Sequence, residues 1–310
     1  MVWCRREKLA EPGSVWWASS HLGAVHGFVN RDETVLLTSG RAADNRSRVG
    51  FARLLPGGAG ADVYRLKYDS EPILAPEGRG TFWSDGLTYP SPLGNLASGR
   101  PDLLFTGWKR GRNKSFANQL GIARFSEVEA KWVPDPSPLF PSWAYGTGSA
   151  SSLDDSGEII AVTAFEEPLV DSRGFLPQYS VRWATRLRNG NYEMGERISG
   201  VPHGNGISVA KPSFLRIGGI QFAWFSVREG RDYRVVGGDI RDGKFNATHA
   251  LGLLPGREYW ESNSVSYLHC WQDCEIVRGV YAGNGYGKEG LGVVSWSVSD
   301  LLAAIEGAPC

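Results

Sequence analysis

The sequence lacks an excess of charge of either sign. Its 33 Lys and Arg residues balance 33 Asp and Glu residues, and the pI is near 7.0. Because no general positive field would gather a polyanion, a nucleic-acid partner is not expected. No stretch approaches the ~20 consecutive apolar residues of a membrane-spanning helix, and the N-terminal run MVWCRREKLAEPG contains no apolar leader. The sequence therefore predicts a cytoplasmic protein without a membrane partner, and it leaves the oligomeric state open.

Cysteine is scarce as well. Of Cys4, Cys270, Cys274 and Cys310, only the second and third lie close together in the sequence, with a spacing wider than CxxC and no second pair beside them. This pattern argues against a structural zinc site. No carboxylate cluster requires a metal either, so the sequence predicts neither a metal nor a cofactor.

Glycine and tryptophan, by contrast, are plentiful, with 40 and 12 residues among 310. Short strand-like runs that end in proline recur as KLAEP, PILAP, PLFP, ISGVP and LGLLP, whose last residues are Pro12, Pro76, Pro141, Pro202 and Pro255. Such a regular spacing indicates an array of similar units. After each proline come three strand-like runs of alternating character, and in all but the last unit an outer strand follows them. Four short strands in a unit predict the blade of a β-propeller.

The predicted fold is all-β: a single-domain, five-bladed β-propeller with four antiparallel strands in each blade. Its blades span residues 13–76, 77–141, 142–202, 203–255 and 256–298, and residues 299–310 follow as a short C-terminal helix. No outer strand follows Val298, because SDLLAAIEG has a helical pattern. Residues 1–12 precede the first proline as the other outer strands precede theirs. We therefore expect this N-terminal strand to complete the fifth blade and to remove the open edge of the array.

Function in a propeller is expected around the funnel that the innermost strands surround. The first and second blades place His21, His26 and Asp85 there, and the fifth places Glu261. Two carboxylates, Asp85 and Glu261, predict acid–base chemistry on a glycosidic bond. His26 is a further candidate proton carrier, because an imidazole titrates near neutral pH. The tryptophans could offer flat faces to sugar rings, although for any single tryptophan packing between blades is the favoured interpretation.

Further polar and aromatic side chains are predicted to bind the substrate. Lys109 and Arg110, with Arg112, form a basic loop after Trp108 that suits an anionic donor or acceptor; a solvated turn is the alternative. The run GNGYG is expected to be a tight turn between strands. The predicted substrate-binding residues are His21, Trp108, Lys109, Arg110, Lys211, Arg228, Arg234, Asn263, Asn284 and Tyr286.

These runs resemble a known group of proteins. WSDGLTYPSPL with LLFTGWKRGRNKSFANQLGIARFS, VAKPSFLRIGGIQFAWFSVREGRDYRVVGGDIRDG, and YWESNSVSYL with VYAGNGYGKEGLGV are similar to blades of the five-bladed propellers related to glycoside hydrolases of the arabinanase and invertase type. Many members of the group are expected from bacterial surface-polysaccharide gene clusters. The resemblance covers roughly Thr81 to Trp296 and implies a carbohydrate-active protein, a glycosidase or a glycosyltransferase, in polysaccharide biosynthesis.

The catalytic carboxylates of that clan are only partly matched. Hydrolases of this clan resemble one another in using an aspartate on the first blade, a second aspartate on the next and a glutamate on the third. Here SSHLGAVHGF and YGTGSASS carry no acid, and Glu166 and Glu167 are the nearest acids to the third position. Asp85 matches the second aspartate, and Glu261 stands where the group has W-D-S. Three functions therefore stay open: an enzyme that cleaves or transfers a glycosyl unit, a non-catalytic sugar-binding propeller, and a scaffold for protein contacts.

Overall fold

The computed structural model describes residues 4–30, 33–57, 64–78, 80–94, 99–110, 117–143, 146–166, 169–171 and 174–306. Within these ranges the chain is built from strands, with α1 (Asn284–Gly287), α2 (Val298–Glu306) and three short 3-10 helices, η1 (Trp16–Ala18), η3 (His249–Leu251) and η4 (Tyr259–Glu261). The all-β prediction is confirmed. No helix of the described part is long and apolar enough to cross a membrane.

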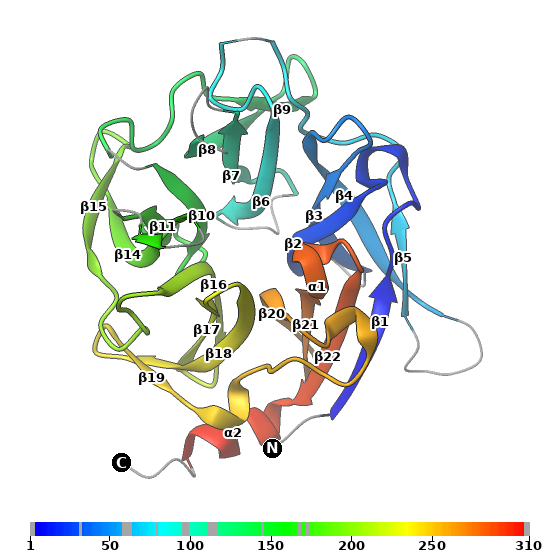
Figure 1. The fold of residues 1–310 in the computed structure, drawn as a ribbon, viewed down its shortest axis with the longest axis vertical. Helices are drawn as coiled ribbons and strands as arrows, with labels where there is room; N and C mark the ends of the chain where they lie inside the picture. Colours follow the sequence, from blue (N-terminus) through cyan, green and yellow to red (C-terminus); the bar gives the residue numbers. More distant parts are fainter. Residues whose placement is uncertain are drawn as a thin grey trace.

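The strands are arranged in antiparallel sheets around a common centre (Figure 1). Three sheets have the strand orders β10-β11-β14-β15, β16-β17-β18-β19 and β1-β22-β21-β20. A larger sheet consists of β2-β3-β4-β5 and β6-β7-β8-β9, joined by one parallel pair, Ser47 with Gly86. The strands are β1 (Cys4–Ala10), β2 (His21–Asn30), β3 (Glu33–Arg41), β4 (Ser47–Pro56), β5 (Tyr64–Tyr68), β6 (Gly86–Leu93), β7 (Asp102–Lys109), β8 (Ala117–Ser126), β9 (Lys131–Pro134), β10 (Thr147–Ser152), β11 (Ile159–Phe165), β12 (Leu169–Asp171), β13 (Gly174–Leu176), β14 (Tyr179–Arg186), β15 (Tyr192–Arg197), β16 (Ile207–Ile217), β17 (Ile220–Glu229), β18 (Asp232–Arg241), β19 (Lys244–Ala247), β20 (Ser266–Asp273), β21 (Ile276–Ala282) and β22 (Leu291–Ser297).

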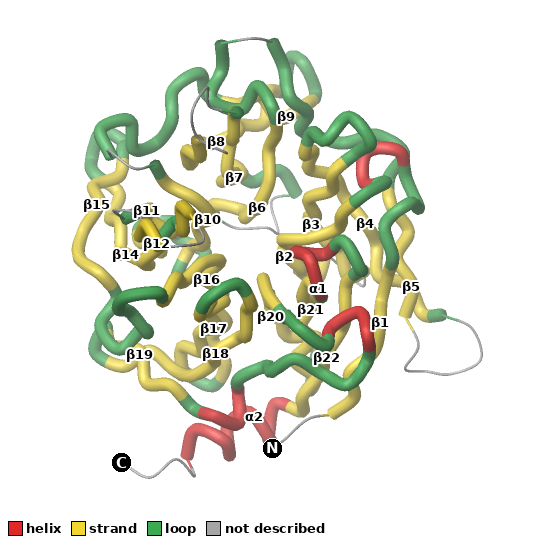
Figure 2. Tube along the Cα trace, in the orientation of Figure 1, coloured by secondary structure: helices red, strands yellow, loops and turns green. Residues whose placement is uncertain are grey.

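This arrangement is propeller-like, as the sequence pattern predicted. The division into five blades with the predicted boundaries stays a prediction, since it depends on how the larger sheet is divided. The N-terminal strand lies where it was expected, because β1 pairs antiparallel with β22 and joins the two ends of the chain in one sheet. The pair β12 and β13 forms a separate hairpin between β11 and β14, which no sequence pattern had indicated (Figure 2).

The core lies between neighbouring sheets and is rich in aromatic rings. Trp17, Trp224 and Trp296 are among the largest fully buried side chains, and the rings of the latter two lie 6.3 Å apart. The glycines opposite such rings leave the space that the rings fill. A Cβ atom on Gly50 would lie 2.5 Å from the Trp17 ring, which explains why small and large residues alternate along these strands.

The innermost strands form a ring, since contacts run from β2 to β6, β10, β16, β20 and back to β2. Each of these strands contains one register shift against its neighbour, for example between Gly23 and His26 in β2 and between Ser266 and His269 in β20. Four of the shifts contain a residue with left-handed backbone: Ala24, Tyr89, Lys211 and Tyr267. A β-bulge re-aims the side chains on either side of it. The bulges therefore divide each inner strand into a part near one end of the axis and a part near the other.

Candidate functional site

A central funnel of about 440 Å³ opens at one end of the axis. It is lined by the first residues of the inner strands and by their neighbours, including His21, Arg41, Trp108, Asn118 and Arg228. Five tyrosines complete the lining: Tyr89, Tyr179, Tyr233, Tyr267 and Tyr286. No Asp or Glu of the described ranges lines this funnel. The site is therefore aromatic, hydroxyl-rich and cationic.

Four of the tyrosines form a continuous aromatic arc. The ring centroids lie 5.1 Å apart for Tyr89 and Tyr267, 5.8 Å for Tyr233 and Tyr267, and 5.9 Å for Tyr233 and Tyr286. Burial raises the pKa of Tyr89, Tyr233 and Tyr267. These phenols are therefore neutral at ordinary pH and are able to donate hydrogen bonds to a ligand. Tyr286 is half exposed at the mouth.

Trp108 lies on β7 at the funnel wall. Trp108 is the strand partner of Gly86 in β6. A Cβ atom on that glycine would lie 2.2 Å from the indole Nε1. The guanidinium carbon of Arg41 lies 5.5 Å from the Trp108 ring centroid, which is within the range of a cation–π contact. The glycine and the arginine together hold the indole against the wall.

His21 is the histidine among the described residues that line the funnel. It begins β2, pairs with Arg41 and has its Nδ1 atom 3.0 Å from the Ser20 hydroxyl. Burial, with the charges of Arg41 and Lys288, lowers the pKa of His21. At neutral pH its imidazole is therefore uncharged and is able to accept a proton.

Four of the predicted site residues thus meet in one funnel: His21, Trp108, Arg228 and Tyr286. His26 lies elsewhere. It lines a second cavity of about 530 Å³ together with later residues of the inner strands, and its ring stacks on His269 at 3.7 Å. Burial, with His269 and Lys211, lowers the pKa of His26 well below its ordinary value. His26 is therefore a neutral, half-buried residue beyond the bulge of β2.

Lys211 is fully buried, and it does not line the funnel. Its Nζ atom has no hydrogen-bond partner within the described part of the chain. Burial lowers the pKa of the Lys211 ammonium to about 7. Its charge also lowers the pKa of both His26 and His269, so the three groups lie near one another on the axis.

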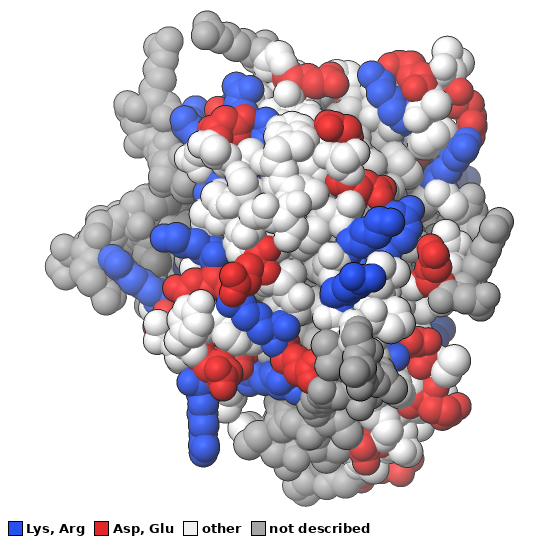
Figure 3. Space-filling model, turned by 90° about the vertical axis from the view of Figure 1, so that its right-hand side faces the viewer, with Lys and Arg blue, Asp and Glu red and all other residues white. Residues whose placement is uncertain are grey.

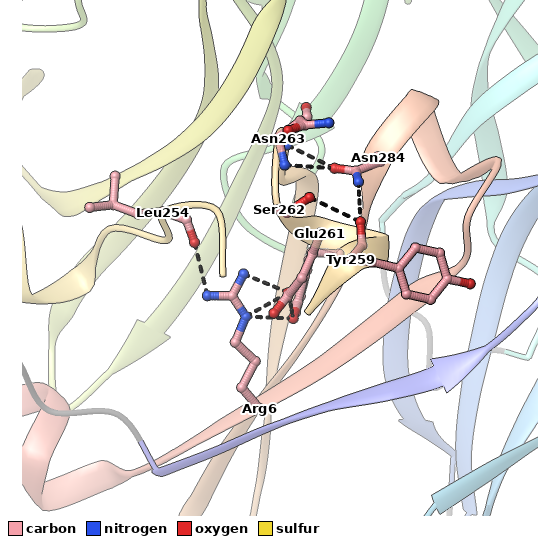
Figure 4. Close-up of polar contacts among 9 residues, drawn as sticks. Arg6, Leu254, Tyr259, Glu261, Ser262, Asn263 and Asn284 are labelled. Atoms are coloured by element: carbon pink, nitrogen blue, oxygen red, sulfur yellow. Dashed lines mark hydrogen bonds and ion pairs between the residues drawn. The ribbon is translucent and has the colours of Figure 1, made fainter. Parts of the chain in front are cut away.

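Glu261, a predicted catalytic residue, also lies off the funnel and holds β1 in place. Arg6 of β1 places its Nη2 2.5 Å and its Nε 2.6 Å from Glu261 Oε2, and the Tyr281 hydroxyl donates to the same oxygen at 2.6 Å (Figure 4). Arg6 Nη1 donates to the Leu254 carbonyl at 2.8 Å. The carboxylate is almost fully buried by these contacts, which is how a paired structural charge is held.

Asn284 and Asn263 belong to the same neighbourhood and not to the funnel lining. Asn284 Oδ1 accepts hydrogen bonds from the backbone N–H groups of Asn263 and Ser264, both at 3.0 Å, and its Nδ2 donates to the Tyr259 carbonyl (Figure 4). The GNGYG run forms the single-turn α1, with left-handed backbone at Gly285 and Tyr286. Asn284 therefore anchors the turn that presents Tyr286.

The remaining predicted residues that the structure describes do not line the funnel. Asp85 Oδ2 accepts the backbone N–H of Arg110 at 2.9 Å, and the side chains of Lys109 and Arg110 are exposed. Arg234 is exposed and pairs with Glu229 at 2.6 Å. Glu166 is bound by Ser180 and Arg182, whereas Arg112 and Glu167 lie outside the described residues. Neither Asp85 nor Glu261, the predicted pair of catalytic carboxylates, lines the funnel.

Sequence reasoning missed Arg41 and most of the arc. A signal was nevertheless present, since Tyr89 and Tyr267 occupy the same place in their bulges, two residues before Ser91 and His269. Aligning the units on this step would have brought the two tyrosines together. Arg41 had no such signal, because it enters the funnel from the end of β3 and not from an inner strand.

No family model matches the chain. A protein of Mycobacterium tuberculosis (strain ATCC 25618 / H37Rv), named "Uncharacterized protein Rv1502", is 26% identical over 314 residues, covering 94% of this chain and 98% of that protein. A solved structure titled "Glycoside hydrolase" matches with a TM-score of 0.68 and 10% identity, covering 95% of this chain and 92% of its own. The chain has the fold of glycoside hydrolase-type propellers. A thermostable family-43 glycoside hydrolase agrees, with a TM-score of 0.60, 12% identity and coverage of 92% and 91%.

Proposed function

We propose that this protein binds a carbohydrate in its central funnel. The observation that carries the proposal is the aromatic arc of Tyr89, Tyr267, Tyr233 and Tyr286, which lines the same cavity as Trp108. Sugar rings pack their apolar faces on flat aromatic side chains, while phenol, amide and guanidinium groups bind their hydroxyls. The fold shared with glycoside hydrolases supports the same class of ligand.

We favour carbohydrate binding over hydrolysis by paired carboxylates because of the residues that line the funnel. Glycoside cleavage by two carboxyl groups needs both to face one bond, at about 5 to 9.5 Å from each other. Within the described residues the funnel has no carboxylate, and Glu261 is occupied by Arg6 and Tyr281. The arrangement fits a sugar-binding propeller that acts beside an enzyme of polysaccharide biosynthesis. A cytoplasmic location is also proposed.

Cleavage or transfer of a glycosyl unit is the second candidate, and His21 favours it. This imidazole lines the funnel and is neutral at ordinary pH, so it is suited to act as a general base. Asp85 is next to the wall, since its backbone N–H donates to the Trp108 carbonyl at 3.2 Å.

A matched pair of tyrosine variants tests the binding proposal. Tyr286 and Tyr259 are both exposed, by 50% and 69%, but only the former lines the funnel. After a glycan array has identified a bound sugar, Tyr286→Ala is expected to weaken its binding about ten-fold in calorimetry, and Tyr259→Ala to leave it unchanged. Absence of any bound glycan, or equal effects of the two variants, would contradict binding in the funnel.

Turnover separates the two candidates. Aryl glycosides and nucleotide-activated sugars are incubated with wild type, His21→Gln, Asp85→Asn and Glu261→Gln. An activity lost in the first two variants establishes an enzyme, and the substrate consumed distinguishes cleavage from transfer. Saturable sugar binding without turnover in any of the four proteins establishes the binding module.

A further inference from the structure

Two arginines in the funnel differ from the other arginines whose side chains the structure describes. Each of the others either has a carboxylate partner, as in Arg48 with Asp44, or is exposed to solvent. Arg41 and Arg228 are partly or fully buried, and no ion pair with a described Asp or Glu involves them. A buried cation without a counter-charge is costly unless a ligand supplies one.

Arg228 is the more deeply placed of the two, with only 5% of its surface exposed. It extends from β17, and its Nη2 donates to the Pro177 carbonyl and, at 3.0 Å, to Ser208 Oγ. Its guanidinium carbon lies 5.2 Å from the Tyr179 ring and 5.8 Å from the Tyr233 ring. Its Nε is buried without a hydrogen-bond partner among the described residues. The guanidinium is thus fixed by neutral groups, and no carboxylate among the described residues pairs with its charge.

Arg41 occupies the opposite end of the aromatic arc. It contacts Trp108, donates from Nη1 to Asn45 Oδ1 at 3.3 Å, and is close enough to Tyr89 and Tyr267 to interact with them electrostatically. The arc connects the two cations in the order Arg228, Tyr233, Tyr267, Tyr89 and Arg41. A single ligand that lies along the arc would therefore meet both guanidinium groups.

The outer surface provides a contrast with the funnel. On the face drawn in Figure 3, Lys and Arg side chains are interspersed with Asp and Glu, which agrees with the zero net charge. The funnel combines two arginines with no acid from the described residues. Protein surrounds these charges, so a positive potential inside the funnel is screened less than at the surface.

We propose that the ligand of the funnel is an acidic carbohydrate, one that carries a phosphate or a carboxylate, and that Arg228 and Arg41 bind its oxyanion. This inference rests on the proposed carbohydrate-binding function and names the class of sugar. Guanidinium groups suit both anions, because their forked donors match two oxygens at once. The tyrosines bind the sugar ring between the two cations.

The proposal of an acidic ligand is tested first on the wild-type protein, with pairs of neutral and acidic sugars. Calorimetry is carried out with glucose and glucuronate, galactose and galacturonate, mannose and mannose 6-phosphate, and inorganic phosphate alone. The acidic member of at least one pair is expected to bind ten-fold or more tightly than its neutral partner, and to weaken as salt is raised. The pair that responds distinguishes a carboxylate from a phosphate ligand.

Three variants then assign the residues. Arg228→Gln and Arg41→Gln are each expected to weaken the acidic ligand about ten-fold more than they weaken its neutral partner, whereas Arg234→Gln, at an exposed residue outside the funnel lining, changes neither. Arg41 is only partly buried, so its variant keeps the test valid if Arg228→Gln does not fold.

The outcomes separate this inference from the proposed function. Equal binding of neutral and acidic sugars would overturn the acidic class and leave carbohydrate binding standing. Phosphate binding that depends on Arg228, without binding of any sugar, would support the anion site and contradict carbohydrate binding. Failure of every probe to bind at millimolar concentration would overturn both.

Discussion

Arg6 and Arg228 are both enclosed in the protein, and their surroundings are opposite. Arg6 meets a carboxylate, a phenol and a carbonyl, which satisfy its charge within the fold. Arg228 meets a carbonyl, a hydroxyl and two aromatic faces, and no described acid. A buried charge that the protein pairs is part of the structure, whereas one that it leaves unpaired is a candidate for binding. The comparison therefore distinguishes Arg6, which holds β1 in its sheet, from Arg228, which belongs to the candidate binding site.

The largest effect is expected from breaking the paired charge. Glu261→Gln leaves Arg6 without its counter-ion in a buried place, and we expect the free energy of unfolding to fall by about 3 kcal/mol. Urea denaturation measures the change. Ligand binding by the folded fraction should persist, because the residue does not line the funnel. A normal stability with lost binding would instead make Glu261 a site residue.

Lys211 extends the comparison to a fully buried ammonium that has no hydrogen-bond partner among the described residues. Its pKa is about 7 in the folded protein against an ordinary 10.5. Between these values the unfolded chain binds more protons, so wild-type stability should rise with pH from about 7 toward 10. Lys211→Met should be more stable by about 2 kcal/mol at pH 7 and should lose this part of the pH dependence.

The measurement is urea denaturation of both proteins at several pH values between 7 and 9.5. The neighbouring His26 and His269 do not interfere, since burial lowers the pKa of both below this window. A wild-type stability that changes with pH no more than that of the variant would show that the Lys211 charge is compensated in the folded protein.

The unpaired arginine should behave in the opposite way to Glu261. Arg228→Gln is expected to change the free energy of unfolding by less than about 1 kcal/mol, because it removes an uncompensated charge together with its few hydrogen bonds. Binding of an acidic ligand should nevertheless fall about ten-fold. Thermal denaturation and calorimetry on the same preparation measure both. A loss of stability as large as that of Glu261→Gln would make Arg228 a structural residue.

The smallest effect is expected at the surface. Glu229→Gln removes the partner of Arg234, and both side chains are about half exposed. We expect the free energy of unfolding to change by less than about 0.5 kcal/mol, because exposed pairs are solvated and screened. This variant is the matched control for Glu261→Gln in urea denaturation. A decrease of more than about 1 kcal/mol in the free energy of unfolding would show that solvent exposure does not predict how much an ion pair stabilises this protein.

The strands were predictable because period-two patterns and proline spacing are local signals. β1 was placed beside β22 because it was the outer strand that the repeat lacked. The role of Glu261 was not predictable, since its partner Arg6 is 255 residues away in the sequence. His21 and His26 are close in sequence, yet the bulge between Gly23 and His26 separates the funnel from the second cavity. A bulge leaves no clear mark in the residue pattern.

The pairing of β1 with β22 also means that β1 is synthesised long before its partner strand. β1 ends at Ala10 and its partner begins at Leu291. At about 5 to 20 residues per second on the ribosome, the first strand waits on the order of 15 to 60 seconds before its partner exists. During that time its edge is free to pair with other chains. The contact that completes the folded sheet is thus the last to become available to the nascent chain.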